Sequence, residues 1–225
     1  MAIIGHGVFL FQWTQNQYMA GPNDGLAQMM PFKHLLYDHY TQGEFFYSFD
    51  FGLGAGIFSE LSYYFSTSFV YLSTLIIVYL LESLKLIGVP DVLFWANASV
   101  FISIARLTIV LIATYTLFRY MRISRLSAVV GASIYGLSGM YFRHAAFWEF
   151  FADAFIWLPL LIFGAEKIFR EQKPGWFMFA VAIAMIDNFY FAYINFLLTG
   201  IYIVFRLFIP LEKTETKWKQ AILWF

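Results

Sequence analysis

Asp24 is the side chain of this sequence best placed to act as a general base. It lies in the stretch Pro22-Asn23-Asp24-Gly25, a turn-like setting near the start of a strongly apolar chain. A carboxylate in a dry environment can accept a proton from a hydroxyl group within hydrogen-bond reach. Aspartate in such a setting also commonly caps the N-terminus of a helix. The two roles are compatible, because a capping aspartate is held rigidly.

His34 and Asp38 follow closely and are four residues apart. On a helix they would share one face, where an imidazole and a carboxylate could together hold a divalent cation. Two ligands do not make a complete metal site, however, and a helix at a membrane surface needs polar residues in any case. The sequence leaves both interpretations open.

Arg106 lies midway along the apolar run from Val92 to Phe118. A charge at that depth of a membrane span is costly and is therefore usually paired or functional. Two interpretations follow. Arg106 forms an ion pair with a carboxylate of the bundle, or it faces a cavity that binds a phosphate group.

The stretch "RHAAFWEFFAD" supplies four further candidate binding residues, Arg143, His144, Glu149 and Asp153. At a membrane edge, Arg143 could hold a lipid phosphate through bidentate contacts. Glu149 and Asp153 are four apart and could face the same cavity. Interfacial tryptophan and charged residues at such a position are equally explained as membrane anchors.

The composition identifies the kind of protein that carries these residues. Of its 225 residues 61% are hydrophobic and 12% charged, and the mean hydropathy is +0.68. Soluble proteins are about 45–50% apolar and about 25% charged, so we expect an integral membrane protein. Its 14 basic and 14 acidic residues cancel and give no argument for nucleic acid as a partner. The absence of cysteine excludes disulfides and thiol catalysis.

Four apolar runs predict membrane-crossing helices. Val92–Phe118 is long enough to cross with tilt, and Leu126–Phe142 and Ala154–Phe169 each match about one short span. Trp176–Phe208 would rise about 50 Å as one helix, which is too long for a single crossing. We therefore expect that run to be a hairpin that turns near Asp187–Tyr190.

The positive-inside rule orients these spans. Basic residues gather in three clusters, each placed in the cytoplasm: Arg119, Arg122 and Arg125; Lys167, Arg170 and Lys173; and Arg206, Lys213, Lys217 and Lys219. The segment from about Thr14 to Asp91 then forms a long extracytoplasmic first loop. Within it we expect an interfacial helix at Gly25–Gln42, an irregular glycine-rich stretch, "SFDFGLGAGIF", and an interfacial or re-entrant helix at Phe69–Leu81, which is too short to cross.

The expected fold is thus an all-α, polytopic helical bundle. We expect a single transmembrane domain over residues 1–225, with the first loop at 14–91, the bundle at 92–208, and a cytoplasmic segment with the start of a further span at 209–225. Ala2–Trp13 lacks a basic start and a cleavage site, so it is not read as a signal peptide. We expect the chain to be a fragment, cut at its C-terminus and clipped at its N-terminus.

Six motifs in this order resemble the YfhO family of bacterial membrane proteins. They are "GPNDGLAQMMPF", "YSFDFGLGAGIFSELSYYFSTSF", "SIARLTIVLIATYTLFRYMRISR", "GASIYGLSGMYF", "DAFIWLPLLIFGAEK" and "NFYFAYI". The resemblance runs from about residue 9 to residue 208. Each motif is mostly aromatic and glycine patterning, and it is their order and spacing that carry the resemblance.

The resemblance implies a glycosyltransferase of the GT-C fold in the bacterial cell membrane. Such enzymes transfer a sugar from a polyprenyl-phosphate carrier to an extracytoplasmic acceptor, here a cell-envelope polymer such as teichoic acid. A carboxylate in the first loop typically acts as base, often near a divalent metal such as Mg²⁺ or Mn²⁺. This implies Asp24 as the base, with Arg106 and Arg143 as phosphate partners. Family members are longer than this chain, so later spans would be missing from it.

Two other classes of function remain open. In a membrane transporter or lipid-carrier flippase, Arg106 would line a translocation path; transporters often show paired repeats with broken helices, and this sequence shows none. A non-catalytic membrane scaffold would tolerate the loss of Asp24 and would bind no carrier lipid.

Overall fold

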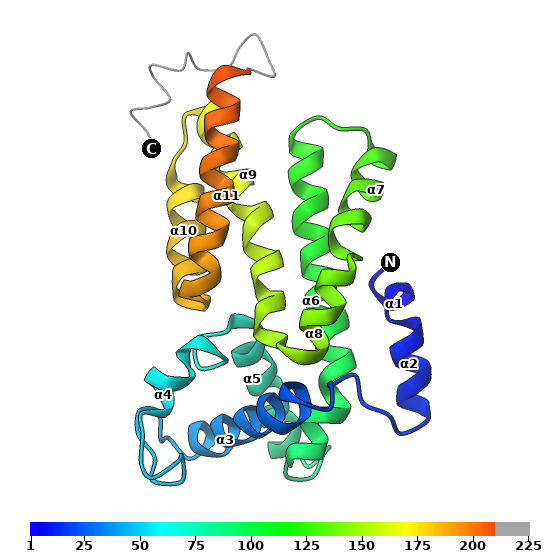
Figure 1. Cartoon of the computed structure of the whole chain (residues 1–225), viewed down its shortest axis with the longest axis vertical. Helices are drawn as coiled ribbons and strands as arrows, with labels where there is room; N and C mark the ends of the chain where they lie inside the picture. Colours follow the sequence, from blue (N-terminus) through cyan, green and yellow to red (C-terminus); the bar gives the residue numbers. More distant parts are fainter. Residues whose placement is uncertain (210–225) are drawn as a thin grey trace. The chain divides into compact units, whose positions relative to one another are not determined.

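A computed structural model describes residues 1–209, and these residues are helical with no β-strand among them, which confirms the all-α class (Figure 1). In chain order the elements are α1 (Ala2–Gly5), α2 (Gly7–Thr14), η1 (Gly25–Met29), α3 (Met30–Thr41), α4 (Ile57–Glu60), η2 (Leu61–Tyr63), α5 (Phe69–Ser83), α6 (Val92–Tyr120), α7 (Arg125–Gly136), α8 (Gly139–Phe147), η3 (Glu149–Asp153), α9 (Ala154–Glu171), α10 (Gly175–Asp187) and α11 (Phe189–Phe208).

The described residues divide into two compact units. Unit 1 comprises Met1–Thr108 and Leu137–Asp153, and unit 2 comprises Ile109–Gly136 and the described part of Ala154–Phe225. The long helix α6 contributes its first half to unit 1 and its second half to unit 2. All the candidate site residues lie in unit 1.

The first loop contains the expected helix at Gly25–Gln42. It is observed as a π-helical turn, η1, that continues directly into α3. Met29, Met30, Leu36 and Tyr37 recur at helical spacing on its buried side and join the core of unit 1. α3 packs against α5, so the core of this unit lies between first-loop helices and the start of α6.

The glycine-rich stretch between α3 and α4 is irregular, as expected. Gly43, Gly52 and Gly54 all have positive φ angles, a conformation that residues with a side chain rarely adopt. A single antiparallel bridge between Ser48 and Ala55 closes the stretch into a narrow loop.

Capping side chains fix the starts of the longer helices of unit 1. Ser68 accepts a hydrogen bond from the Tyr71 amide at the start of α5, and Asp91 accepts one from the Phe94 amide at the start of α6. α5 has 15 residues, which is too short to cross a bilayer and agrees with the expected short helix in this region.

The run Leu126–Phe142 is not the one continuous helix expected for a single span, and its crossing of the membrane stays a prediction. α7 ends at Gly136 and α8 begins at Gly139, because the Ser138 side chain accepts a hydrogen bond from the Tyr141 amide and starts a new helix. The serine in Gly136-Leu137-Ser138-Gly139 interrupts a helix that hydrophobicity alone would continue.

Unit 2 is built around α9, against which α10 and α11 both pack. Gly164 lets the backbone of α10 approach at Phe177, because a Cβ atom at that position would collide with the Phe177 backbone. The 33-residue run is broken at Asp187–Asn188, where Asn188 caps α11 through the Phe191 amide. The predicted break near Asp187–Tyr190 is therefore confirmed, and Figure 1 shows α10 and α11 side by side.

Two described helices are long and apolar enough to cross a membrane, α6 and α11, and two shorter apolar helices, α5 and α10, are not. The polytopic architecture thus remains a prediction. The expected cytoplasmic tail and further span, with Lys213, Lys217 and Lys219, lie outside the described residues apart from Ile209.

Candidate functional site

Asp24 precedes η1 but does not cap it, because its side chain makes no hydrogen bond to the helix start. Its Oδ2 atom instead accepts a hydrogen bond of 2.7 Å from Nε1 of Trp148, which lies between α8 and η3. The carboxylate is half-buried, and no other described residue donates to it. One of its oxygens is therefore held while the other remains available to accept a proton.

Two glycines hold the Asp24 turn against α8. The Gly21 amide donates a 2.7 Å hydrogen bond to the Ala146 carbonyl. At Gly25 a Cβ atom would collide with that same carbonyl oxygen, so only glycine permits this approach. The backbone contact and the indole bond together join the first loop to the end of α8 and the residue that follows it, although 124 residues separate Asp24 from Trp148.

Arg143 and His144 lie next to this junction on α8. Arg143 is exposed, makes no ion pair with any described residue, and places its guanidinium 5.7 Å from the centre of the Trp148 ring. His144 is buried against Trp148 and Phe151, and its Nδ1 atom has no hydrogen-bond partner among the described residues. Burial lowers the pKa of His144, so the neutral imidazole is favoured.

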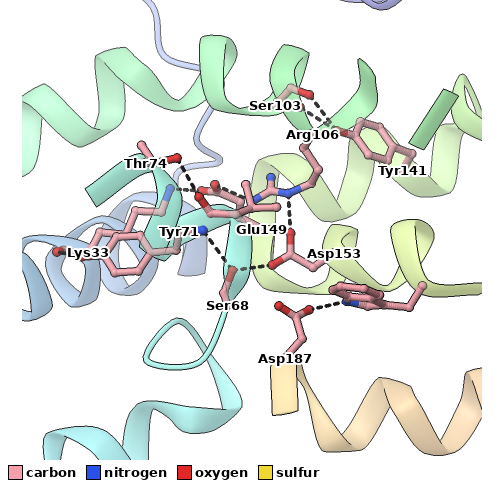
Figure 2. A network of polar contacts seen from close by, with 12 residues as sticks. Lys33, Ser68, Tyr71, Thr74, Ser103, Arg106, Tyr141, Glu149, Asp153 and Asp187 are labelled. Atoms are coloured by element: carbon pink, nitrogen blue, oxygen red, sulfur yellow. Dashed lines mark hydrogen bonds and ion pairs between the residues drawn. The ribbon is translucent and has the colours of Figure 1, made fainter. Parts of the chain in front are cut away.

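Lys33, Arg106, Glu149 and Asp153 form a buried cluster of four ionisable side chains, which Figure 2 shows. The Glu149 carboxylate accepts one hydrogen bond from Lys33 of α3 and another, of 3.0 Å, from Nη2 of Arg106 on α6. Asp153 accepts from Nε of Arg106 and from the Ser68 hydroxyl, each at 2.6 Å. All four ionised side chains are at most 3% exposed.

Opposite charges decide the ionisation of this cluster. Burial raises the pKa of the Glu149 carboxyl, but Lys33 and Arg106 outweigh that effect and hold its pKa below the usual range. Burial dominates for Asp153, whose pKa is raised, and for Lys33, whose pKa is lowered. Glu149 is thus the carboxylate that the cluster most strongly keeps ionised.

In the structure Arg106 forms ion pairs with Glu149 and Asp153, which is the first of the two interpretations offered by the sequence. Arg106, Glu149 and Asp153 bind one another in a buried site, whereas Asp24, Arg143 and Trp148 meet at a more exposed one. Glu149 and Asp153 both accept hydrogen bonds from Arg106, while a shared cavity and substrate binding by these residues stay predictions.

Sequence reasoning missed Lys33, Ser68 and Trp148 as partners. Lys33 could have been found, because it lies three and four residues before Leu36 and Tyr37 on the stripe that forms the core. A lysine on a buried stripe requires a carboxylate partner. Nothing in the local sequence indicates that Trp148 binds Asp24.

His34 and Asp38 do share a face of α3, with His34 Nε2 3.4 Å from Asp38 Oδ2. They line a pocket of about 420 Å³ together with residues of the glycine-rich loop and the first residue of α6: Pro31, His34, Leu35, Asp38, His39, Gln42, Glu44, Asp50 and Val92. Within residues 1–209, however, no group of three or more histidine, cysteine, aspartate or glutamate side chains is arranged to hold a metal ion. The described residues therefore do not fit a bound divalent metal.

Comparison with known families now places the chain. A family model described as "Bacterial membrane protein YfhO" matches residues 1–225. The chain belongs to the YfhO family. This confirms the family that the six motifs resembled, and with it a bacterial membrane protein.

A curated YfhO relative, "Uncharacterized protein YfhO" of Bacillus subtilis (strain 168), is 50% identical over 224 residues. That match covers 99% of this chain and 26% of the relative, so the chain spans about a quarter of the relative's length. No solved structure matches this YfhO chain.

Proposed function

We propose that this YfhO chain carries the acceptor-activating part of a membrane glycosyltransferase of the GT-C class. The donor is a sugar on a polyprenyl-phosphate carrier, and the acceptor is a hydroxyl group of an extracytoplasmic cell-envelope polymer such as teichoic acid. The observation that carries the proposal is the Asp24 carboxylate, which Trp148 fixes through one oxygen while no described residue donates to the other.

In this mechanism Asp24 accepts the proton of the acceptor hydroxyl as its oxygen attacks the anomeric carbon of the donor. The new glycosidic bond forms as the bond between the anomeric carbon and the phosphate oxygen breaks, and polyprenyl phosphate leaves. Arg143 is exposed beside the same tryptophan and makes no ion pair with a described residue, so it can bind the phosphate of the leaving carrier. Inversion at the anomeric carbon is what the family resemblance implies.

Arg106 has a different task in this proposal. Because Glu149 and Asp153 occupy its guanidinium, Arg106 stabilises the junction between the loops and is not assigned to the carrier phosphate. His144 is buried beside Trp148 and supports the tryptophan's position.

The proposal requires a multi-pass orientation with the first loop outside the cell. The basic residues at the ends of α6 and α9, Arg119, Arg122, Lys167 and Arg170, support that orientation through the positive-inside rule. A divalent metal has no assigned role, because the described residues do not fit one and two ligands, His34 and Asp38, are too few.

The test uses the native protein that carries this sequence. Asp24→Asn keeps the side chain's shape but removes the base, so sugar incorporation into the cell-wall polymer should collapse while the amount of protein in the membrane is unchanged. Asp50→Asn, an exposed carboxylate of the same loop, is the matched control and should retain activity. Normal transfer by Asp24→Asn would overturn the proposal.

A transporter or lipid-carrier flippase is the second candidate, and one observation favours it. Arg106 lies on a candidate membrane span, and its buried Nη1 atom has no hydrogen-bond partner among the described residues. Ionisable residues within membrane spans often mark substrate or ion pathways. Carrier-lipid movement without any sugar transfer by the wild-type protein would favour this candidate.

A further inference from the structure

The loop between α3 and α4 exposes a cluster of apolar side chains that the glycosyltransferase proposal does not use. We define the aromatic tip as Phe45, Phe46, Tyr47, Phe49 and Leu53. We propose that the aromatic tip inserts into the interfacial region of the lipid bilayer and holds the first loop at the membrane surface.

The burial pattern of this loop is the reverse of that of a loop in water. Ser48 is 5% exposed, whereas its neighbours Phe49 and Phe46 are 79% and 72% exposed. The Ser48 hydroxyl oxygen lies 3.0 Å from Nε2 of His39 and accepts a hydrogen bond from the Asp50 amide, so the hydroxyl has its hydrogen-bond partners within the protein. A loop that buries its serine and exposes its phenylalanines suits an apolar partner.

The tip is held in this conformation by specific contacts. His39 Nδ1 lies 2.7 Å from a carboxylate oxygen of Glu44, and the Ser48–Ala55 bridge closes the loop. At Gly54 a Cβ atom would collide with the Tyr47 hydroxyl, and φ there is +104°, so glycine is required at this turn. The exposed rings therefore belong to a built surface.

The position of the loop identifies the bilayer as the partner. The base of the loop, at Glu44 and Asp50, lines the same pocket as Val92, which is the first residue of the candidate span α6. The tip is thus attached where that helix begins, at the level where a span meets the headgroup region. Aromatic side chains are enriched at that depth.

The charges of the loop indicate which lipid headgroups the aromatic tip would favour. Residues 43–60 contain Glu44, Asp50 and Glu60 and no lysine or arginine. The tip therefore inserts through apolar contacts alone, and anionic headgroups should not strengthen its insertion.

The chain's lack of cysteine permits a direct test. Leu53→Cys, at a fully exposed position, is labelled with an environment-sensitive fluorophore, and the protein is placed in phosphatidylcholine nanodiscs. We expect blue-shifted emission, loss of emission with nitroxide lipids labelled near the headgroup, and protection from aqueous iodide. Asn23→Cys, an exposed polar position of the same unit, is the control and should be quenched by iodide.

Two results would overturn the inference. Quenching of the Leu53 label by iodide to the same extent as the control would place the tip in water. Protection from both iodide and nitroxide lipids would show that protein covers it, whether a second copy or another part of the native chain. Adding Phe46→Ser and Phe49→Ser to the labelled protein should abolish the lipid quenching, and unchanged quenching would also count against the proposal.

Discussion

Each of the two units of this chain buries a cluster of ionisable side chains, but the two clusters connect different parts of the fold. In unit 1, Lys33, Arg106, Glu149 and Asp153 come from α3, α6 and η3, and Ser68 adds the cap of α5. In unit 2, Glu166 accepts from Arg170 of its own helix and from Tyr202 and Arg206 of α11. The first cluster gathers distant segments, whereas the second links two neighbouring helices.

This difference indicates that the two clusters have different roles in the protein. A cluster that joins three helical segments and a helix cap fixes the first loop against η3, and Glu149 directly follows Trp148, which holds Asp24. The Glu166 cluster lies between α9 and α11, which also pack against each other. We therefore expect the unit 1 cluster to support activity as well as stability, and the unit 2 cluster to support stability alone.

The largest effect should come from Glu149→Ala. Removing the shared carboxylate leaves Lys33 buried without its partner, and breaking a buried ion pair in this way costs about 3–5 kcal/mol of folding free energy. Denaturant unfolding in detergent measures the loss, and proteolysis should cut the first loop more rapidly. An unchanged midpoint and cleavage pattern would mean that the cluster does not hold the loops.

Glu166→Ala should have a smaller effect, about 3 kcal/mol, because the buried Arg206 keeps its hydrogen bond to the Ile209 carbonyl, and Arg170, whose side chain is 10% exposed, can be hydrated. The same unfolding measurement applies. Sugar transfer by the surviving folded protein should be normal, in contrast to Glu149→Gln, which should lower both stability and transfer. Loss of transfer in Glu166→Ala would remove the distinction between the clusters.

Trp148→Phe tests the link between the unit 1 cluster and Asp24. Phenylalanine keeps the ring but removes the Nε1–H donor, so the carboxylate loses its fixed position. Transfer should fall about 10- to 100-fold, since small displacements of a catalytic group have effects of that size. The free energy of unfolding should change by only about 1 kcal/mol. Steady-state kinetics should show the loss in kcat with KM retained; a change confined to KM would contradict a positioning role.

The smallest effect is a dependence of stability on pH. Because the folded pKa of Glu149 is held below its ordinary value of 4.5, its ionisation stabilises the fold above that pH. That stabilisation is lost as the pH falls through the lower folded pKa, while the raised pKa of Asp153 opposes the trend. Unfolding midpoints measured from pH 6 down to about pH 3 should fall less steeply for Glu149→Gln than for wild type. Parallel curves would contradict the predicted role of Glu149.

The sequence predicted much of the fold and less of the site. The helix at Gly25–Gln42 and the break after Asp187 follow from amphipathic spacing and a polar interruption, which are local signals. The break at Ser138 was missed because hydrophobicity does not register a serine cap. The contacts Asp24–Trp148 and Lys33–Glu149 join residues more than 100 positions apart, and no local pattern encodes which distant side chain satisfies a buried charge.

The most direct test of the central claim separates donor binding from transfer in the purified native protein. Single-turnover transfer from a polyprenyl-phosphate sugar would be measured for wild type, Asp24→Asn and Asp24→Glu, together with the affinity of each for the donor. The account predicts that Asp24→Asn binds the donor as wild type does but transfers almost no sugar, while Asp24→Glu retains part of the activity. Wild-type transfer by Asp24→Asn would show that Asp24 is not the base.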